Sequence, residues 1–209
     1  LQMRAGAGAP PPASFDDYVI SYMGEIIANG VEASVWSGAA ATPGQFEGFL
    51  TAATGAFAVD GTVNGSTASG AYDATNIIAN LQQLTSDMAT NISAVLRKED
   101  LHIYMSPKTY AIYISAVSTL GYVNAYNMNG DYAPVFEGYK IAVCNGMPND
   151  QLVAAEKSNL FFGTDLLSDQ TRISLMDMAA LDGSDNMRLV ARYSGGVQLG
   201  IGADIVHQS

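Results

Sequence analysis

Basic side chains are scarce in this sequence of 209 residues. It holds 9 Lys and Arg against 20 Asp and Glu, which gives a formal net charge of −11 and a pI of about 4.3. Before Arg97 the only basic residue is Arg4. Tight binding of a nucleic-acid backbone needs clustered Lys and Arg, because these side chains neutralise phosphates. The sequence therefore argues against sequence-specific binding of nucleic acid.

Cysteine and long apolar runs are also scarce. The single cysteine, Cys144, excludes an intrachain disulfide and a multi-cysteine metal site. It follows three apolar residues, 141–143, which predicts a buried and unreactive thiol. No run approaches the roughly 18 apolar residues of a membrane-spanning helix, and the opening residues lack the apolar block of a signal peptide. Because the chain begins with Leu, we expect it to be processed or part of a longer protein.

Charged residues of both signs make up only 14% of the chain, whereas hydrophobic residues make up 48%. Soluble domains usually hold about 25% charged residues. This composition excludes a chain that is disordered as a whole, and it suggests a surface that partners cover. The 11 Tyr and 9 Met support this interpretation, since both types are enriched at protein interfaces. Ordinary packing of these residues is the alternative.

Motifs for catalysis, cofactors or metals are missing. The only histidines are His102, in an expected strand, and His207, and no Gly-x-Ser-x-Gly elbow is present. The Gly200-Ile201-Gly202 phrase leaves no room for the helix of a dinucleotide site. Residues 127–131 and 182–186 have oxygens at alternate positions but favour plain turns over calcium loops. We therefore predict a protein that is not an enzyme, with no catalytic, cofactor-binding or metal-binding residues.

The first third of the chain predicts an arm, a helix and an irregular segment. Residues 1–13, rich in Gly, Ala and Pro, predict a flexible arm or linker. Apolar residues at helical spacing predict a helix over 15–36, with Ser14 as its N-cap. Gly24 and Gly30 within it suggest a bend or close approach by another backbone. The Gly-rich residues 37–74 predict an irregular stretch, with short strands possible at 46–50 and 56–59.

The remaining residues predict a mixture of helices and strands. An amphipathic helix is expected over 76–95, with Thr75 as its N-cap and Arg97 and Lys98 at its C-terminal end. Ser106-Pro107 predicts the start of a helix over 107–120, with Tyr110, Ala111, Ile114 and Val117 on one face. Residues 122–134 predict a loop. Strands are expected at 101–105, 140–144, 151–155, 160–162, 171–176 and 187–201, the last interrupted at Gly195-Gly196.

The order of these elements resembles a known family. A strand runs into Met105-Ser106-Pro107 and a helix; Gly138-Tyr139-Lys140-Ile141 and Leu160-Phe161-Phe162-Gly163 follow, and then paired long strands. This arrangement is similar to the C-terminal portion of tailed-bacteriophage major capsid proteins of the HK97-like fold, over about 190 residues. The helix at 15–36 resembles that family's spine helix. The family's N-terminal arm and its long β-hairpin, the E-loop, have no counterpart in this sequence.

The resemblance implies an α+β fold with two domains. The P-domain, 14–74 and 166–209, would carry the spine helix and long antiparallel strands. The A-domain, 75–165, would mix helices and a β-sheet and place the loop 122–134 near the capsomer centre. The assembly-interface residues expected from it are Tyr126, Asn129, Asp131, Tyr132, Glu25 and Glu32. Crosslinking between subunits is not expected, because the E-loop that carries the reactive Lys in some members is absent.

The function that the resemblance implies is structural. Copies of the chain would form pentamers and hexamers of an icosahedral shell around double-stranded DNA, in a virion assembled in the bacterial cytoplasm. The DNA would be enclosed without sequence-specific binding, and no membrane or cofactor is expected. Portal, scaffold or protease and decoration proteins of the same phage are expected partners. The alternatives are an encapsulin-type compartment with the same fold and, from another class, a small hydrolase or sugar-binding module.

Overall fold

The computed structural model describes residues 15–51, 53–68, 70–120, 135–165, 173–178, 183, 187–191 and 193–209. The α-helices in this part of the chain are α1 (Phe15–Ser37), α2 (Ala56–Asp60), α3 (Ile77–Asn91) and α4 (Pro107–Thr119). The strands are β1 (Asn64–Ser66), β2 (Leu101–Met105), β3 (Val135–Phe136), β4 (Tyr139–Val143), β5 (Leu152–Glu156), β6 (Leu160–Gly163), β7 (Ile173–Asp177), β8 (Met187–Ala191), β9 (Gly196–Leu199) and β10 (Val206–Gln208). Short 3-10 turns follow β5 (Lys157–Asn159) and β9 (Gly202–Asp204).

The chain divides into two compact units. One comprises residues 1–29 and 164–194, and the other comprises 30–163 and 195–209. These bounds differ from the division expected from the sequence, which separated 14–74 and 166–209 from 75–165. In the structure β1 and β10 share a sheet with β2, β4 and β5. The assignment of P- and A-domains stays a prediction.

A six-stranded mixed sheet forms the centre of the larger unit, in the order β1-β10-β5-β2-β4-β3. The central strand β2 runs parallel to β4 and antiparallel to β5, with Ile103 opposite Ile141 and Ala154. At one edge β1 runs parallel to β10. At the other edge a tight turn at Glu137 and Gly138, both with positive φ, joins β3 to β4.

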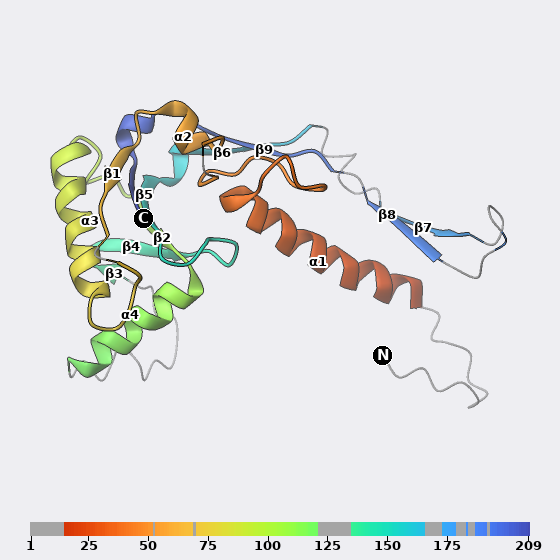
Figure 1. The fold of residues 1–209 in the computed structure, drawn as a ribbon, viewed down its shortest axis with the longest axis horizontal. Helices are drawn as coiled ribbons and strands as arrows, with labels where there is room; N and C mark the ends of the chain where they lie inside the picture. Colours follow the sequence, from red (N-terminus) through yellow and green to blue (C-terminus); the bar gives the residue numbers. More distant parts are fainter. Residues whose placement is uncertain are drawn as a thin grey trace. The chain divides into compact units, whose positions relative to one another are not determined.

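Helices α3 and α4 cover one face of this sheet (Figure 1). The buried stripe of α3 consists of Ile77, Leu81, Leu84 and Met88, all fully shielded from solvent. Every second residue of β2, namely Leu101, Ile103 and Met105, packs into the same cluster. The apolar residues that recur with helical spacing in α3 and with alternating spacing in β2 therefore pack in one core, as expected for a helix on a sheet.

Aromatic residues build the core on the opposite face. Trp36, at the end of α1, packs on Phe49 and on Tyr104 of β2, with ring centroids 5.8 and 5.6 Å apart. Phe57 of α2 packs on Phe49 and extends the cluster toward His207 of β10. The segment 46–50, expected as a strand, is irregular, and its amides at Phe49 and Leu50 donate to carbonyls of Val35 and Trp36 instead.

Helix α1 confirms the helix expected over 15–36. Ser14, its expected N-cap, lies outside the described residues. Gly24 and Gly30 were expected to mark a bend or the close approach of another backbone, and a Cβ at either would meet nothing within 4 Å among the described residues of this chain. Although α1 is 23 residues long, none of the helices in the described ranges is apolar enough over its length to cross a membrane.

The caps of α3 and α4 agree with those predicted from the sequence only in part. Ser106 accepts a hydrogen bond from the Thr109 amide, and Pro107 occupies the first turn of α4, as predicted. Thr75 does not cap α3. The Asp73 carboxylate accepts hydrogen bonds from the Thr75 and Asn76 amides, and these bonds, with one from the Thr75 hydroxyl, lower its pKa.

Two further expectations about helices are wrong, and the face named on α4 is only partly buried. Helix α3 ends at Asn91, so Arg97 and Lys98 are not in its last turn. On α4 the buried residues are Thr109 and Ala116, with Tyr110, Ile112 and Tyr113 packed beside them, whereas Ala111 is exposed. Residues 56–59 form α2 rather than a strand, because Gly61 with a φ of 66° ends a helical turn there.

The expected strands of the C-terminal half are present, with one difference in topology. The long strand predicted over 187–201 is two strands, because β8 ends at Ala191 and β9 begins at Gly196, and the two belong to separate two-stranded sheets. β8 pairs with β7, and β9 pairs with β6, both antiparallel. The sequence did not indicate β1 or β10, whose three residues each are too few to show a period of two.

Candidate assembly surfaces

Most of the expected interface residues cannot be placed. Tyr126, Asn129, Asp131 and Tyr132 lie outside the described residues. Glu25 is exposed on α1. Glu32 is half-buried, and its Oε1 accepts a hydrogen bond of 3.2 Å from the Gly146 amide. The structure therefore gives Glu32 a contact within its own chain, and the role of both acids in assembly stays a prediction.

Helix α1 exposes an apolar stripe that was not among the interface residues expected from the sequence. Tyr18, Tyr22 and Ile26 are spaced by four residues and are 52%, 55% and 47% exposed. The two tyrosine rings stack, with centroids 6.4 Å apart. A spacing of four places side chains on one helix face, and this signal was visible in the sequence. The helix over 15–36 was predicted from the spacing of its apolar residues, and the two tyrosines were not considered in it.

A second exposed apolar region lies on the β6–β9 ribbon. Phe161 and Phe162 are 54% and 48% exposed, although they are adjacent and point to opposite sides of the strand. Phe162 packs against Phe46, with centroids 6.0 Å apart. Beyond β9, Ile201 is 59% exposed. Large apolar side chains exposed in this number are typical of surfaces that contact other proteins.

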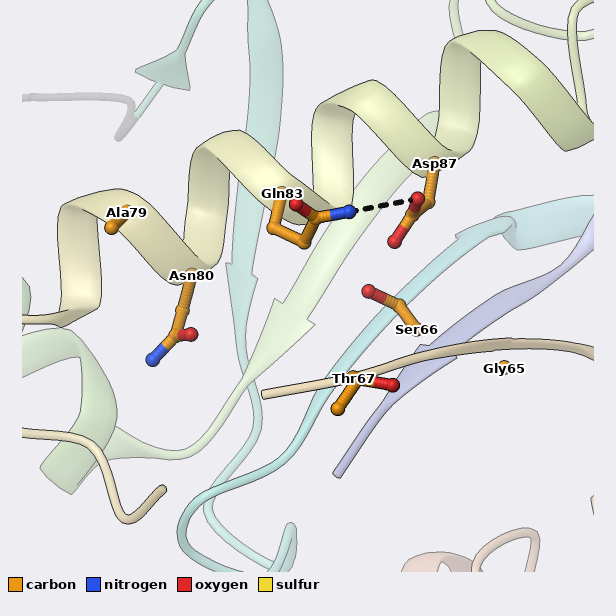
Figure 2. Close-up of a pocket in the computed structure, with 7 residues that line it drawn as sticks. All are labelled: Gly65, Ser66, Thr67, Ala79, Asn80, Gln83 and Asp87. Atoms are coloured by element: carbon orange, nitrogen blue, oxygen red, sulfur yellow. Dashed lines mark hydrogen bonds between the residues drawn. The ribbon is translucent and has the colours of Figure 1, made fainter. Parts of the chain in front are cut away.

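A polar pocket of about 530 Å³ lies between α3 and β1 (Figure 2). Its lining residues are Gly65, Ser66, Thr67, Ala79, Asn80, Gln83 and Asp87. Gln83 donates a hydrogen bond of 3.0 Å to the Asp87 carboxylate, and Ser66 accepts one from Gln208. The lining offers amides, hydroxyls and one negative charge, which suits hydrogen bonding to a polar or basic group.

A second pocket, of about 340 Å³, lies against β10 on the other face of the sheet. It is lined mainly by apolar side chains, namely Phe49, Leu50, Phe57, Ala58 and Val63, together with Gly65, Thr51, Gln151, His207 and Ser209. The His207 ring is 3.0 Å from the Gln151 side-chain oxygen, and burial lowers its pKa. The imidazole therefore contacts an amide and not the carboxylate of a catalytic pair.

Comparisons with known proteins depend on structure alone. No protein-family model matches the sequence, and no curated protein matches it. The capsid of an empty GTA particle aligns over 93% of the chain, with a TM-score of 0.61 and 15% identity. A structure of Gordonia phage Cozz aligns over 94% with a TM-score of 0.55 and 12% identity, and the capsid of Myoviridae Phage XM1 over 92% with 0.51 and 11%. The chain has the HK97-like capsid fold.

The HK97-like fold confirms the α+β fold class and the resemblance expected from the order of elements. At 11–15% identity the fold is what the chain shares with these structures. The chain spans 64–65% of the length of the three matched chains, so it corresponds to about two thirds of each.

Neither the single cysteine nor the His, Cys, Asp and Glu residues in the described ranges form a reactive or metal-binding site. Cys144 is half-buried, and burial followed by the charge of Glu32 raises the pKa of its thiol to about 11. A thiol with so high a pKa is almost entirely protonated at neutral pH and therefore reacts weakly. The full burial expected from the sequence is only partial. In the described ranges no cluster of three His, Cys, Asp or Glu residues could hold a metal ion.

Proposed function

We propose that the chain is a major capsid subunit of a tailed phage or of a related particle such as a GTA. In this role copies form pentamers and hexamers of an icosahedral shell that encloses double-stranded DNA. The observation that carries the proposal is the HK97-like fold, which extends over 93% of the chain in the alignment to the GTA capsid. In this proposal the shell assembles in the bacterial cytoplasm, and the protein is a component of the virion.

The surface of the chain supports this role. Tyr18, Tyr22 and Ile26 on α1 and Phe161 and Phe162 on β6 leave large apolar side chains exposed. A stable protein interface buries roughly 800 Å² per partner with an apolar centre. A subunit that contacts several neighbours needs several such surfaces. Charged residues make up only 14% of the sequence, which agrees with a surface that contacts other copies of the chain.

The negative charge of the subunit implies weak binding between the shell wall and its DNA. A net charge of −11 repels phosphates, so the wall encloses the genome without holding it tightly. Portal, scaffold or protease and decoration proteins of the same particle are the further partners that such a shell requires. Their contacts with this chain belong to the same proposal.

Purification of the protein at its full natural length tests the proposal directly. Size-exclusion chromatography and electron microscopy should show capsomer rings or closed icosahedral shells at high protein concentration. A monodisperse monomer across the full range of concentration and salt would overturn it. Particles recovered from the host distinguish two shells of this fold: nuclease-protected DNA inside supports the phage or GTA role, whereas an enzyme cargo without DNA supports the encapsulin-type compartment instead.

A further inference from the structure

Among the described residues β1 is an edge strand of the six-stranded sheet and pairs only with β10. Asn64 donates its amide hydrogen to the Ile205 carbonyl at 3.0 Å, and Asn64, Gly65 and Ser66 lie opposite Val206, His207 and Gln208. In a parallel pair alternate residues bond to the same neighbour, so the amide and carbonyl of Gly65 face away from β10. A Cβ at Gly65 would meet nothing within 4 Å, so the face of β1 at Gly65 is also open.

Pockets lie on both faces of the sheet at this edge, and Gly65 lines both of them. Ser66, which accepts a hydrogen bond from the buried Gln208, lines the polar pocket beside α3, where Figure 2 shows Asp87 and Gln83 above Ser66. His207, opposite Gly65, faces the apolar pocket formed by Phe57 and its neighbours. A strand added at this edge would project alternate side chains into the two pockets.

The two linings require different side chains at adjacent positions of such a strand. A residue opposite Gly65 points toward the pocket of Leu50, Phe57 and Val63, which suits an aliphatic side chain. Its neighbour points toward the polar pocket, in which the charged lining residue is Asp87. A basic side chain is the complement of that carboxylate. The site thus specifies an aliphatic residue next to a basic residue.

The chain itself carries a strand with this pattern. β7 and β8 pair with each other and, among the described residues, with no third strand. A ribbon of two strands is marginally stable alone and gains from a further neighbour. In β8 the exposed Arg188 is followed by Leu189. We infer that β8 of a second copy adds to the free edge of β1, with Leu189 opposite Gly65 and Arg188 facing Asp87.

This inference rests on the proposed function, because shell assembly is what brings a second copy to the edge. Gly65→Pro removes the outward amide at a position where an edge strand tolerates proline. Gly65→Ala keeps the amide and fits the open space, so it is the matched control. Losing one hydrogen bond per contact should raise the protein concentration needed for assembly about fivefold. Equal assembly by folded Pro and Ala variants would overturn the inference.

Charge reversal tests the partner strand independently of the backbone. Asp87→Arg and Arg188→Asp should each weaken assembly, whereas the double variant should restore it, because the two charges are exchanged. Circular dichroism confirms that each variant folds. Single variants that assemble normally, or a double variant no better than either, would exclude β8 as the partner. If wild-type protein forms shells, these failures affect only the inference; if wild-type protein never assembles, the proposed function itself fails.

Discussion

The phenol of Tyr72 donates a 3.1 Å hydrogen bond to the side-chain oxygen of Gln208, and both side chains are buried. The amide of Gln208 in turn donates to Ser66 at 3.1 Å. This chain of polar groups ties the segment before α3 to β10 and to β1. Burial, and after it the charge of Asp150, raises the pKa of Tyr72, so the phenol stays a donor well above neutral pH.

Tyr72→Phe is therefore expected to lower the free energy of unfolding by roughly 1–2 kcal/mol, because it removes the donor and leaves the Gln208 oxygen buried. Urea unfolding followed by Trp36 fluorescence measures the change. Tyr22→Phe is the matched control, since Tyr22 is 55% exposed and its stacked ring is retained. A loss for Tyr72→Phe no larger than for the control would show that the bond contributes nothing.

The parts of the fold that depend on residues close together in the sequence were predictable. Ser106-Pro107 marks the start of α4 because a hydroxyl caps the first turn and proline needs no amide partner there. The apolar spacing of Ile77, Leu81, Leu84 and Met88 indicates a helix and its buried face at once. In β2 the alternation of buried residues indicates a strand with two different faces.

Features that depend on distant partners were not predictable. β1 and β10 are three residues each and become strands by pairing with each other, and β10 also pairs with β5; in both pairs the partner residues are more than 50 positions apart in sequence. The edge at Gly65 and the pockets beside it are products of this pairing. Likewise Asp73, not Thr75, satisfies the amides before α3, since both residue types are good caps and only the chain path selects one.

The ion pair between Lys98 and Glu156 gives a second prediction. Lys98 Nζ is 2.7 Å from Glu156 Oε1, and the carboxylate side chain is only 9% exposed. The hydrogen bond that Lys98 donates to the Glu156 carboxylate raises the pKa of Lys98, so the contribution of the pair to stability is complete below the unfolded pKa and is lost as pH rises through the folded one. Lys98→Met should lower the urea midpoint more than Lys140→Met, an exposed control on β4. Equal midpoints for the two variants would contradict a stabilising pair.

His207 gives a prediction for mild acid. Burial lowers its pKa, so between the folded pKa and the unfolded value of about 6.5 the unfolded state binds more protons. The stability contribution of the neutral imidazole is present above about pH 6.5 and falls as pH drops through that interval. His207→Gln should therefore show a smaller fall in unfolding midpoint on acidification than wild-type protein. An equal fall in midpoint for His207→Gln and wild-type protein would refute the assignment to His207.

Gly146 marks a close approach of backbones in the larger unit. A Cβ at this position would lie 2.5 Å from the Ala33 amide nitrogen and would also collide with the Glu32 carbonyl. The Gly146 amide donates to the Glu32 side chain at the same point. Gly146→Ala should lower the free energy of unfolding by about 1–3 kcal/mol, since neither backbone can move without disturbing α1. An unchanged urea midpoint would show that the turn has room to shift.

Gly24 and Gly30 should behave in the opposite way. Both are inside α1, where Ala is favoured over Gly by roughly 0.5–1 kcal/mol, and a Cβ at either position meets nothing within 4 Å of this chain. Gly24→Ala and Gly30→Ala should each raise the thermal midpoint and helical circular dichroism of the unassembled subunit. A lowered midpoint would mean that the helix needs glycine within the subunit. If the variants are more stable but form fewer shells, the two glycines are needed where a neighbouring copy approaches α1, because the added methyl group has space in the free chain alone.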